Sequence, residues 1–127
     1  MPTLERIVGS HVRITFVNAL AAARDVLRTN ANLAMVICGV HFDDSRMYDL
    51  LDYVHRERPD VSFVSVRILD AELPRASREG VELALRMAGA AAFIDFASLI
   101  IERGRIAAEQ QLETQVLRHL HPKATGG

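Results

Sequence analysis

The chain has 127 residues, half of them apolar and 24 % charged, so we expect one globular domain over 1–121 and a flexible tail over 122–127. Its 15 basic and 16 acidic residues give a net charge of −1, which argues against a nucleic-acid partner. The single cysteine excludes a disulfide framework and any zinc site built from several cysteines. No signal-peptide pattern and no apolar run of about 20 residues is present, so we expect a cytoplasmic protein without a membrane partner. We also expect no cofactor and no metal ion.

Strand and helix patterns alternate along the chain. A β-branched run predicts a strand over 11–17, and an Ala- and Leu-rich stretch predicts a helix over 19–29. The continuous apolar run 33–40 suits a strand covered on both faces. An amphipathic helix over 45–58 and a strand over 61–66 follow.

The second half of the chain repeats this alternation. A polar loop over 67–74 leads into a helix over 76–88 and a short strand over 91–94. The last helix covers 98–120, with an interruption near Gly104. We therefore predict an α/β fold, a doubly wound and mainly parallel sheet of four strands with helices on both faces and a long C-terminal helix.

Three local patterns carry a family resemblance over 33–96. They are an apolar strand with a loop and a Leu-Leu helix over 35–51, a strand ending in serine over 61–65, and a Gly-Ala strand over 89–94. In order and spacing this region resembles the response-regulator receiver domain, a flavodoxin-like fold. The first strand of that family is missing here, and in the strand order 2-1-3-4-5 it is central. The resemblance therefore implies a rearranged four-stranded sheet and favours a homodimer.

The residues that receivers use for phosphorylation are replaced. Gly39 stands where the resemblance places the phosphoacceptor Asp, and Phe96 stands where it places a Lys. The hydroxyl of Ser65 matches the family's Thr or Ser, but the acidic pair that holds Mg²⁺ is absent. An isolated hydroxyl does not transfer phosphoryl groups, so the resemblance implies a degenerate receiver without catalytic residues.

Polar residues follow the strands at the edge where doubly wound folds bind ligands. These candidate ligand-binding residues are His41, Asp43, Asp44, Arg67 and Asp95. An imidazole and a carboxylate could bind a metal ion. The alternative is a polar loop in which Asp44 and Ser45 cap the next helix. We also hypothesise an ion pair between Arg67 and Asp95. Cys38, inside an apolar strand, is interpreted as a small buried hydrophobe.

Apolar residues near the C-terminus exceed what a small domain needs to bury. The resemblance places an interface on the face of helix four, strand five and helix five, and the terminal helix adds an apolar stripe. The alternative is that this stripe packs against its own chain. The interface candidates are Leu83, Arg86, Met87, Phe93, Ile100, Ile101, Leu112, Val116 and Leu120.

Three functional hypotheses follow. The first is a non-enzymatic, phosphorylation-independent signalling module with a protein partner, in a setting like a bacterial two-component system. The second is a flavodoxin-like domain or small enzyme that binds a small ligand at the strand edge. The third is a structural subunit in which another chain supplies the missing strand.

Overall fold

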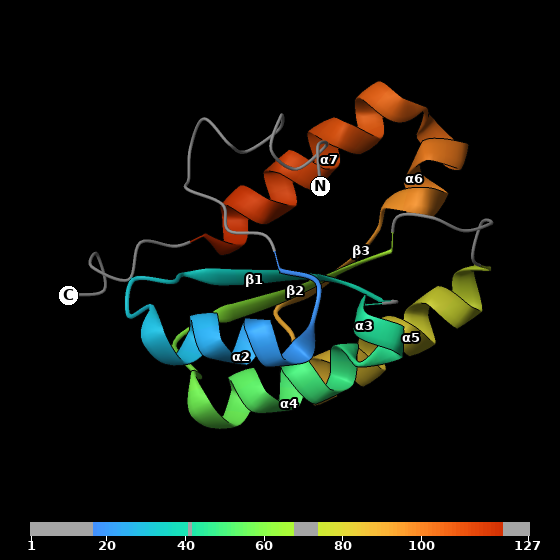
Figure 1. The fold of residues 1–127 in the computed structure, drawn as a ribbon. Helices are drawn as coiled ribbons and strands as arrows, with labels where there is room; N and C mark the ends of the chain where they lie inside the picture. The colour runs from blue at the N-terminus through green and yellow to red at the C-terminus, as the bar shows by residue number, and fades with distance from the viewer. Residues whose placement is uncertain (1–16, 41, 68–73, 121–127) are drawn as a thin grey trace.

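The sheet is parallel and has three strands within the residues that the structure, a computed structural model, describes, namely 17–40, 42–67 and 74–120. The strands are β1 (Met35–Gly39), β2 (Ser62–Arg67) and β3 (Ala92–Asp95), with β2 in the centre (Figure 1). Each coincides closely with a predicted strand. The prediction of an α/β fold with a parallel sheet is therefore confirmed.

Three helices lie together on one side of this sheet (Figure 1). They are α2 (Leu20–Thr29), α4 (Met47–Glu57) and α5 (Arg75–Met87), and the one-turn helix α3 (Phe42–Ser45) precedes α4. Their apolar stripes form what we call the first core, because residues three and four apart share one helix face. Its buried side chains include Leu20, Leu27, Leu50, Leu51, Val54, Phe63 and Leu85.

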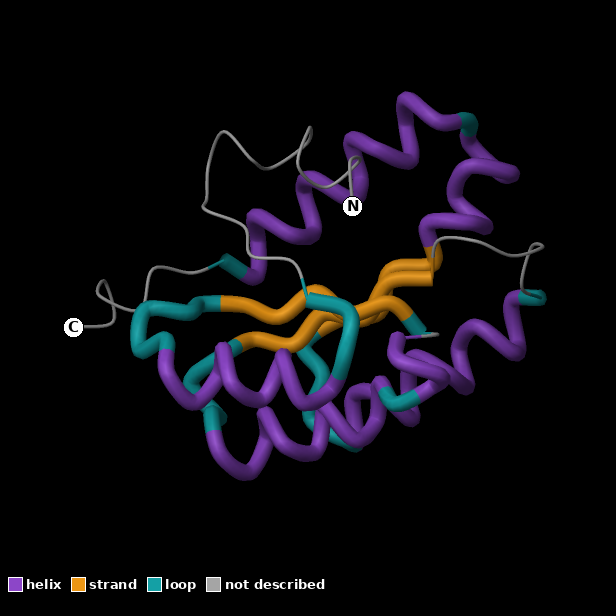
Figure 2. Tube along the Cα trace, in the orientation of Figure 1, coloured by secondary structure: helices purple, strands orange, loops and turns teal. Residues whose placement is uncertain are grey.

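The last two helices lie on the other side of the sheet and meet at a sharp bend (Figures 1 and 2). They are α6 (Phe96–Arg103) and α7 (Arg105–His119). Gly104 between them has φ +84° and ψ 164°, a backbone conformation open almost exclusively to glycine. The interruption predicted near Gly104 is therefore confirmed. This bend folds α7 back over the sheet.

The apolar stripe of α7 packs against its own chain. Leu112 and Val116 are fully buried, and with Val64, Val66 and Ile94 they belong to a second core beneath α6 and α7. The expectation that Leu112 and Val116 contribute to an interface is therefore wrong, because side chains without exposed surface cannot contact a partner.

The central strand β2 joins the two cores. Five of its six residues are buried. Phe63 belongs to the first core, whereas Val64 and Val66 belong to the second. Alternation of side chains across a strand produces this division, with residues on both faces of β2 buried.

Several predicted boundaries need correction. Helix α4 begins at Met47 rather than Ser45, since 42–45 form a separate turn of helix. Arg67 is the last residue of β2 rather than part of a loop, and α6 begins at Phe96 rather than Ser98.

Other predictions lie outside the described residues. They are the strand over 11–16, most of the loop after β2, and the tail over 122–127. Val17, the last residue of the predicted first strand, is described and is not in a strand.

Candidate functional site

The candidate site lies at the carboxyl ends of the three strands. In the parallel register Gly39 lies beside Val66, and Arg67 lies beside Asp95. The ends of neighbouring parallel strands therefore bring these residues to one edge of the sheet, as their positions in the sequence predict.

A buried polar network occupies this edge. The guanidinium Nη1 of Arg67 lies 2.7 Å from Oδ1 of Asp95, with side-chain exposures of 10 % and 2 %. The backbone N–H of Ser98 donates to the same oxygen at 3.1 Å, and the Ser98 hydroxyl donates to Oδ2 at 2.8 Å. The hypothesis of an ion pair between Arg67 and Asp95 is confirmed.

Asp95 also begins a helix. It is the N-cap residue of α6, where its carboxylate satisfies a backbone N–H that has no partner within the helix. Sequence analysis missed Ser98, although Asp is a preferred N-cap residue and Asp95 directly precedes the helix. The network thus joins the end of β2 to the start of α6.

The hydroxyl of Ser65 is fully buried. Its Oγ lies 2.9 Å from the thioether sulfur of Met47, at the first turn of α4. Thioether sulfur is a weak acceptor, so this contact leaves the hydroxyl weakly bound but enclosed. Ser65 therefore presents no hydroxyl to solvent.

The two positions that the resemblance associates with phosphorylation carry no reactive group. Phe96 is 1 % exposed and packs in the second core. Gly39 ends β1, and a Cβ placed there would have Val66 O at 3.9 Å as its nearest neighbour. Space for a side chain therefore exists at Gly39, and steric exclusion does not explain the glycine.

Asp43 has a structural contact. Its backbone has φ +44°, and its Oδ2 accepts a hydrogen bond from the N–H of Leu20 at 2.7 Å. This carboxylate caps α2, whose own N-cap residue Ala19 has no side-chain acceptor, and its charge suits the positive end of the helix. The expected cap on α4 by Asp44 and Ser45 rests on side chains outside the described residues, and Arg46, the N-cap residue of α4, makes no capping hydrogen bond with its own side chain. His41 and the side chain of Asp44 lie outside the described residues.

No cluster of three or more His, Cys, Asp or Glu side chains that could hold a metal ion occurs among the described residues. In that same part of the chain, no helix is both long and apolar enough to cross a membrane. Burial raises the pKa of the Cys38 thiol to about 12, so it stays protonated at neutral pH and is a poor nucleophile.

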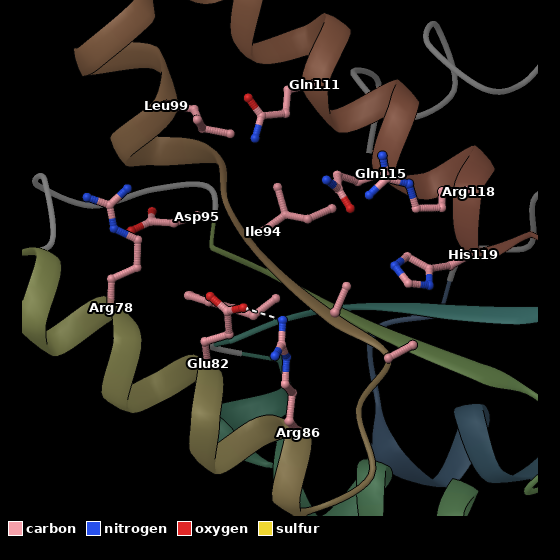
Figure 3. Close-up of a pocket in the computed structure, with 13 residues that line it drawn as sticks. Arg78, Glu82, Arg86, Ile94, Asp95, Leu99, Gln111, Gln115, Arg118 and His119 are labelled. Atoms are coloured by element: carbon pink, nitrogen blue, oxygen red, sulfur yellow. Dashed lines mark hydrogen bonds and ion pairs between the residues drawn. The ribbon is translucent and has the colours of Figure 1, made fainter.

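A groove runs beside β3, between α5 and α7 (Figure 3). It has a volume of about 420 Å³, and we call it the β3 groove. Side chains from both helices reach into it above and below the strand (Figure 3). Its lining residues are Arg78, Glu82, Arg86, Ala91, Ala92, Phe93, Ile94, Asp95, Leu99, Gln111, Gln115, Arg118 and His119.

Two of the remaining interface candidates, Arg86 and Phe93, line this groove, and the candidates differ in exposure. Leu83, Met87 and Ile101 are 60 %, 80 % and 57 % exposed, and Arg86 is exposed as well. The partly buried candidates pack against one of the two cores, and they are Phe93, Ile100 and Leu120. Other large apolar side chains that are exposed among the described residues are Val17, Tyr48 on α4 and Ile106 on α7.

Comparison with known proteins gives no relative, since no family model, curated protein or solved structure matches this chain.

Proposed function

We propose that this chain is a receiver-like protein-interaction module that works without phosphorylation and without catalysis. It belongs to a signalling system of the bacterial two-component type. The order β1-β2-β3 supports this proposal, because it agrees with the last three strands of the order 2-1-3-4-5. The positions of α4 and α5 on one side and α6 and α7 on the other agree with a doubly wound fold.

The observation that carries the proposal is the occupied carboxyl edge of the sheet. Gly39 offers no nucleophile, and Phe96 offers no cation. The carboxylate of Asp95 is held by Arg67 and Ser98. Phosphoryl transfer depends on a metal ion and positive charge arranged around the phosphoryl group, and these residues supply neither to an incoming donor. We propose that the buried network holds the side chains at this edge of the sheet in one arrangement.

Binding takes place on the face formed by α5, β3, α6 and α7. Two large apolar side chains of α5, Leu83 and Met87, lie four residues apart and are mostly exposed. Helix α5 has a single buried residue, Leu85, so most of its surface is open to a partner. Exposed apolar groups of this kind are typical of protein-interaction sites.

Two experiments test the proposed function. Incubation with acetyl phosphate and Mg²⁺, followed by intact-mass measurement, is expected to give no phosphorylated species, while a receiver with an intact phosphoacceptor is labelled in parallel. A phosphoryl group found on any Asp of this chain contradicts the proposal.

The second experiment locates the binding face. A photo-crosslinking amino acid is placed at Leu83 or Met87 in the source cells, with Tyr48 as the matched exposed position on α4. We expect a cross-linked protein partner from α5 and none from Tyr48. Equal products at all three positions, or none at Leu83 and Met87, contradict binding on this face. The homodimer expected from the sequence stays a prediction that light scattering checks.

A further inference from the structure

The amino half of β3 presents backbone hydrogen-bonding groups to the β3 groove. The N–H of Ala91 donates to Phe63 O at 2.8 Å and so points toward β2. In the register of β3 with β2, Ala92 and Ile94 lie opposite Val64 and Val66, and the backbone groups of these even-numbered β2 residues face β1. The backbone groups of Ala92 and Ile94 therefore bond β2, whereas the N–H and C=O of Phe93 between them point the other way, toward the groove that Phe93 lines. Among the described residues β3 pairs with β2 alone, and Ala91 and Ala92 keep exposed surface. Such an edge is a template for a further strand.

Positive charge gathers at the same end. Arg86 in the last turn of α5 and Arg118 in the last turn of α7 approach the groove from its two walls (Figure 3). Three arginines and two carboxylates line the groove, and both carboxylates are already in ion pairs, Glu82 with Arg86 and Asp95 with Arg67. The groove therefore carries a formal charge of +1 (3 − 2), against −1 for the whole chain.

Two polar side chains on the α7 wall are available to bind a ligand. Neither Gln115 nor Arg118 makes a hydrogen bond or ion pair to another described residue, and both line the groove. The guanidinium of Arg118 favours a carboxylate ligand, because a hydrogen bond between a guanidinium and a carboxylate is stronger than one between neutral groups.

From these features we propose that the β3 groove binds an extended, acidic peptide segment of a partner protein as an added strand beside β3. This inference rests on the proposed function and specifies its binding mode. The peptide backbone pairs with Phe93, and an acidic side chain meets Arg118. The four residues of β3 span about 13 Å, so the bound segment is short.

A second copy of the chain fits this groove less well. Edge-to-edge pairing of two β3 strands would bring the two α5 helices together in antiparallel order. The row Arg78, Glu82 and Arg86 reads the same in both directions, so in register Arg would face Arg and Glu would face Glu. Like charges in opposition destabilise such a pair.

The probe is a fluorescein-labelled peptide that alternates Glu and Val, with a peptide that alternates Lys and Val as its charge-reversed control. Binding is followed by fluorescence anisotropy with the full-length protein. We expect the acidic peptide alone to bind, and Arg118→Glu to weaken its affinity about tenfold or more. Arg105→Glu makes the same charge change on α7 outside the groove and should leave affinity within about twofold. N-methylation of alternate peptide amides should also weaken binding, because it removes strand hydrogen bonds.

The outcomes separate the two proposals. Equal binding of both peptides, no binding at millimolar concentration, or equal loss in the two variants overturns the peptide site. Light scattering that shows a dimer dissociated by Arg118→Glu assigns the groove to a second copy and also overturns it. If the peptide site fails while cross-links at Leu83 and Met87 persist, the proposed function stands. If those cross-links are absent too, both fail.

Discussion

The buried pair of Arg67 and Asp95 predicts a large and specific loss of stability when one partner loses its charge. Asp95→Asn preserves the shape of the side chain and an oxygen that can accept the N–H of Ser98. It removes the negative charge that faces the guanidinium of Arg67 at 2.7 Å, where the two side chains are 10 % and 2 % exposed. Removing one partner of such a buried pair costs about 3–5 kcal/mol of folding free energy. We expect about 3 kcal/mol, since the cap on α6 is kept.

The assay is urea denaturation followed by circular dichroism at neutral pH, with Asp52→Asn as the matched control. Asp52 pairs with Arg56 at 3.0 Å, but its side chain is 65 % exposed, so its loss should cost less than about 0.5 kcal/mol. The double variant Arg67→Met with Asp95→Asn should be less destabilised than the two single losses added together. Equal losses for Asp95→Asn and Asp52→Asn, or strict additivity in the double variant, would refute the reasoning.

Five further outcomes are expected. Leu112→Ala should cost about 2–5 kcal/mol in the same assay because Leu112 is fully buried, whereas Leu83→Ala at an exposed position should change stability by less than about 0.5 kcal/mol. Gly104→Ala forces a Cβ into a backbone conformation with φ +84° and should cost about 1–3 kcal/mol, a value that a smaller measured loss contradicts. With a pKa of about 12, only about one Cys38 thiol in a thousand is ionised at pH 9, so iodoacetamide should label it far more slowly in native protein than in urea. The same raised pKa makes the folded state hold its proton above pH 9 while the unfolded state releases it, so Cys38 lowers stability as pH rises from about 9 to 12, and Cys38→Ala should remove that dependence. Gly39→Ala meets no close neighbour at its Cβ and should raise stability by about 0.4–1 kcal/mol, measured as a shift of the urea midpoint.

The sequence predicts the elements with strong periodicity well. The apolar positions of α4 at 47, 50, 51 and 54 are all buried, since a stripe at helical spacing has one stable solution, which is to face a core. The continuous apolar run around Ile37 predicted β1 for the corresponding reason. The pairing of Arg67 with Asp95 could be predicted because parallel strands end at one edge.

Tertiary contacts decided what the sequence left open. The stripe of Leu112 and Val116 looked available to a partner, yet the bend at Gly104 places it on the sheet. Asp43 caps α2 from 23 residues away, which no local pattern reveals. Ser98 was missed because the helix start was placed two residues too late. In each case the missing information was the path of the chain in three dimensions rather than a residue preference.

Strand β3 contributes to both the buried network and the β3 groove, but it does so through different residues. The side chain of Asp95, at its carboxyl end, is bound by Arg67 and Ser98, while the backbone of Phe93, in its amino half, faces the groove. Loss of the Asp95 charge should therefore lower the stability of the fold, and through it the population able to bind, without changing the groove's own chemistry. Loss of the Arg118 charge should weaken peptide binding and leave stability nearly unchanged, because Arg118 is exposed and its side chain makes no hydrogen bond or ion pair to another described residue. In the proposed interaction module, the buried network holds the carboxyl end of β3, so the proposed binding face needs no phosphoryl group to keep it in place.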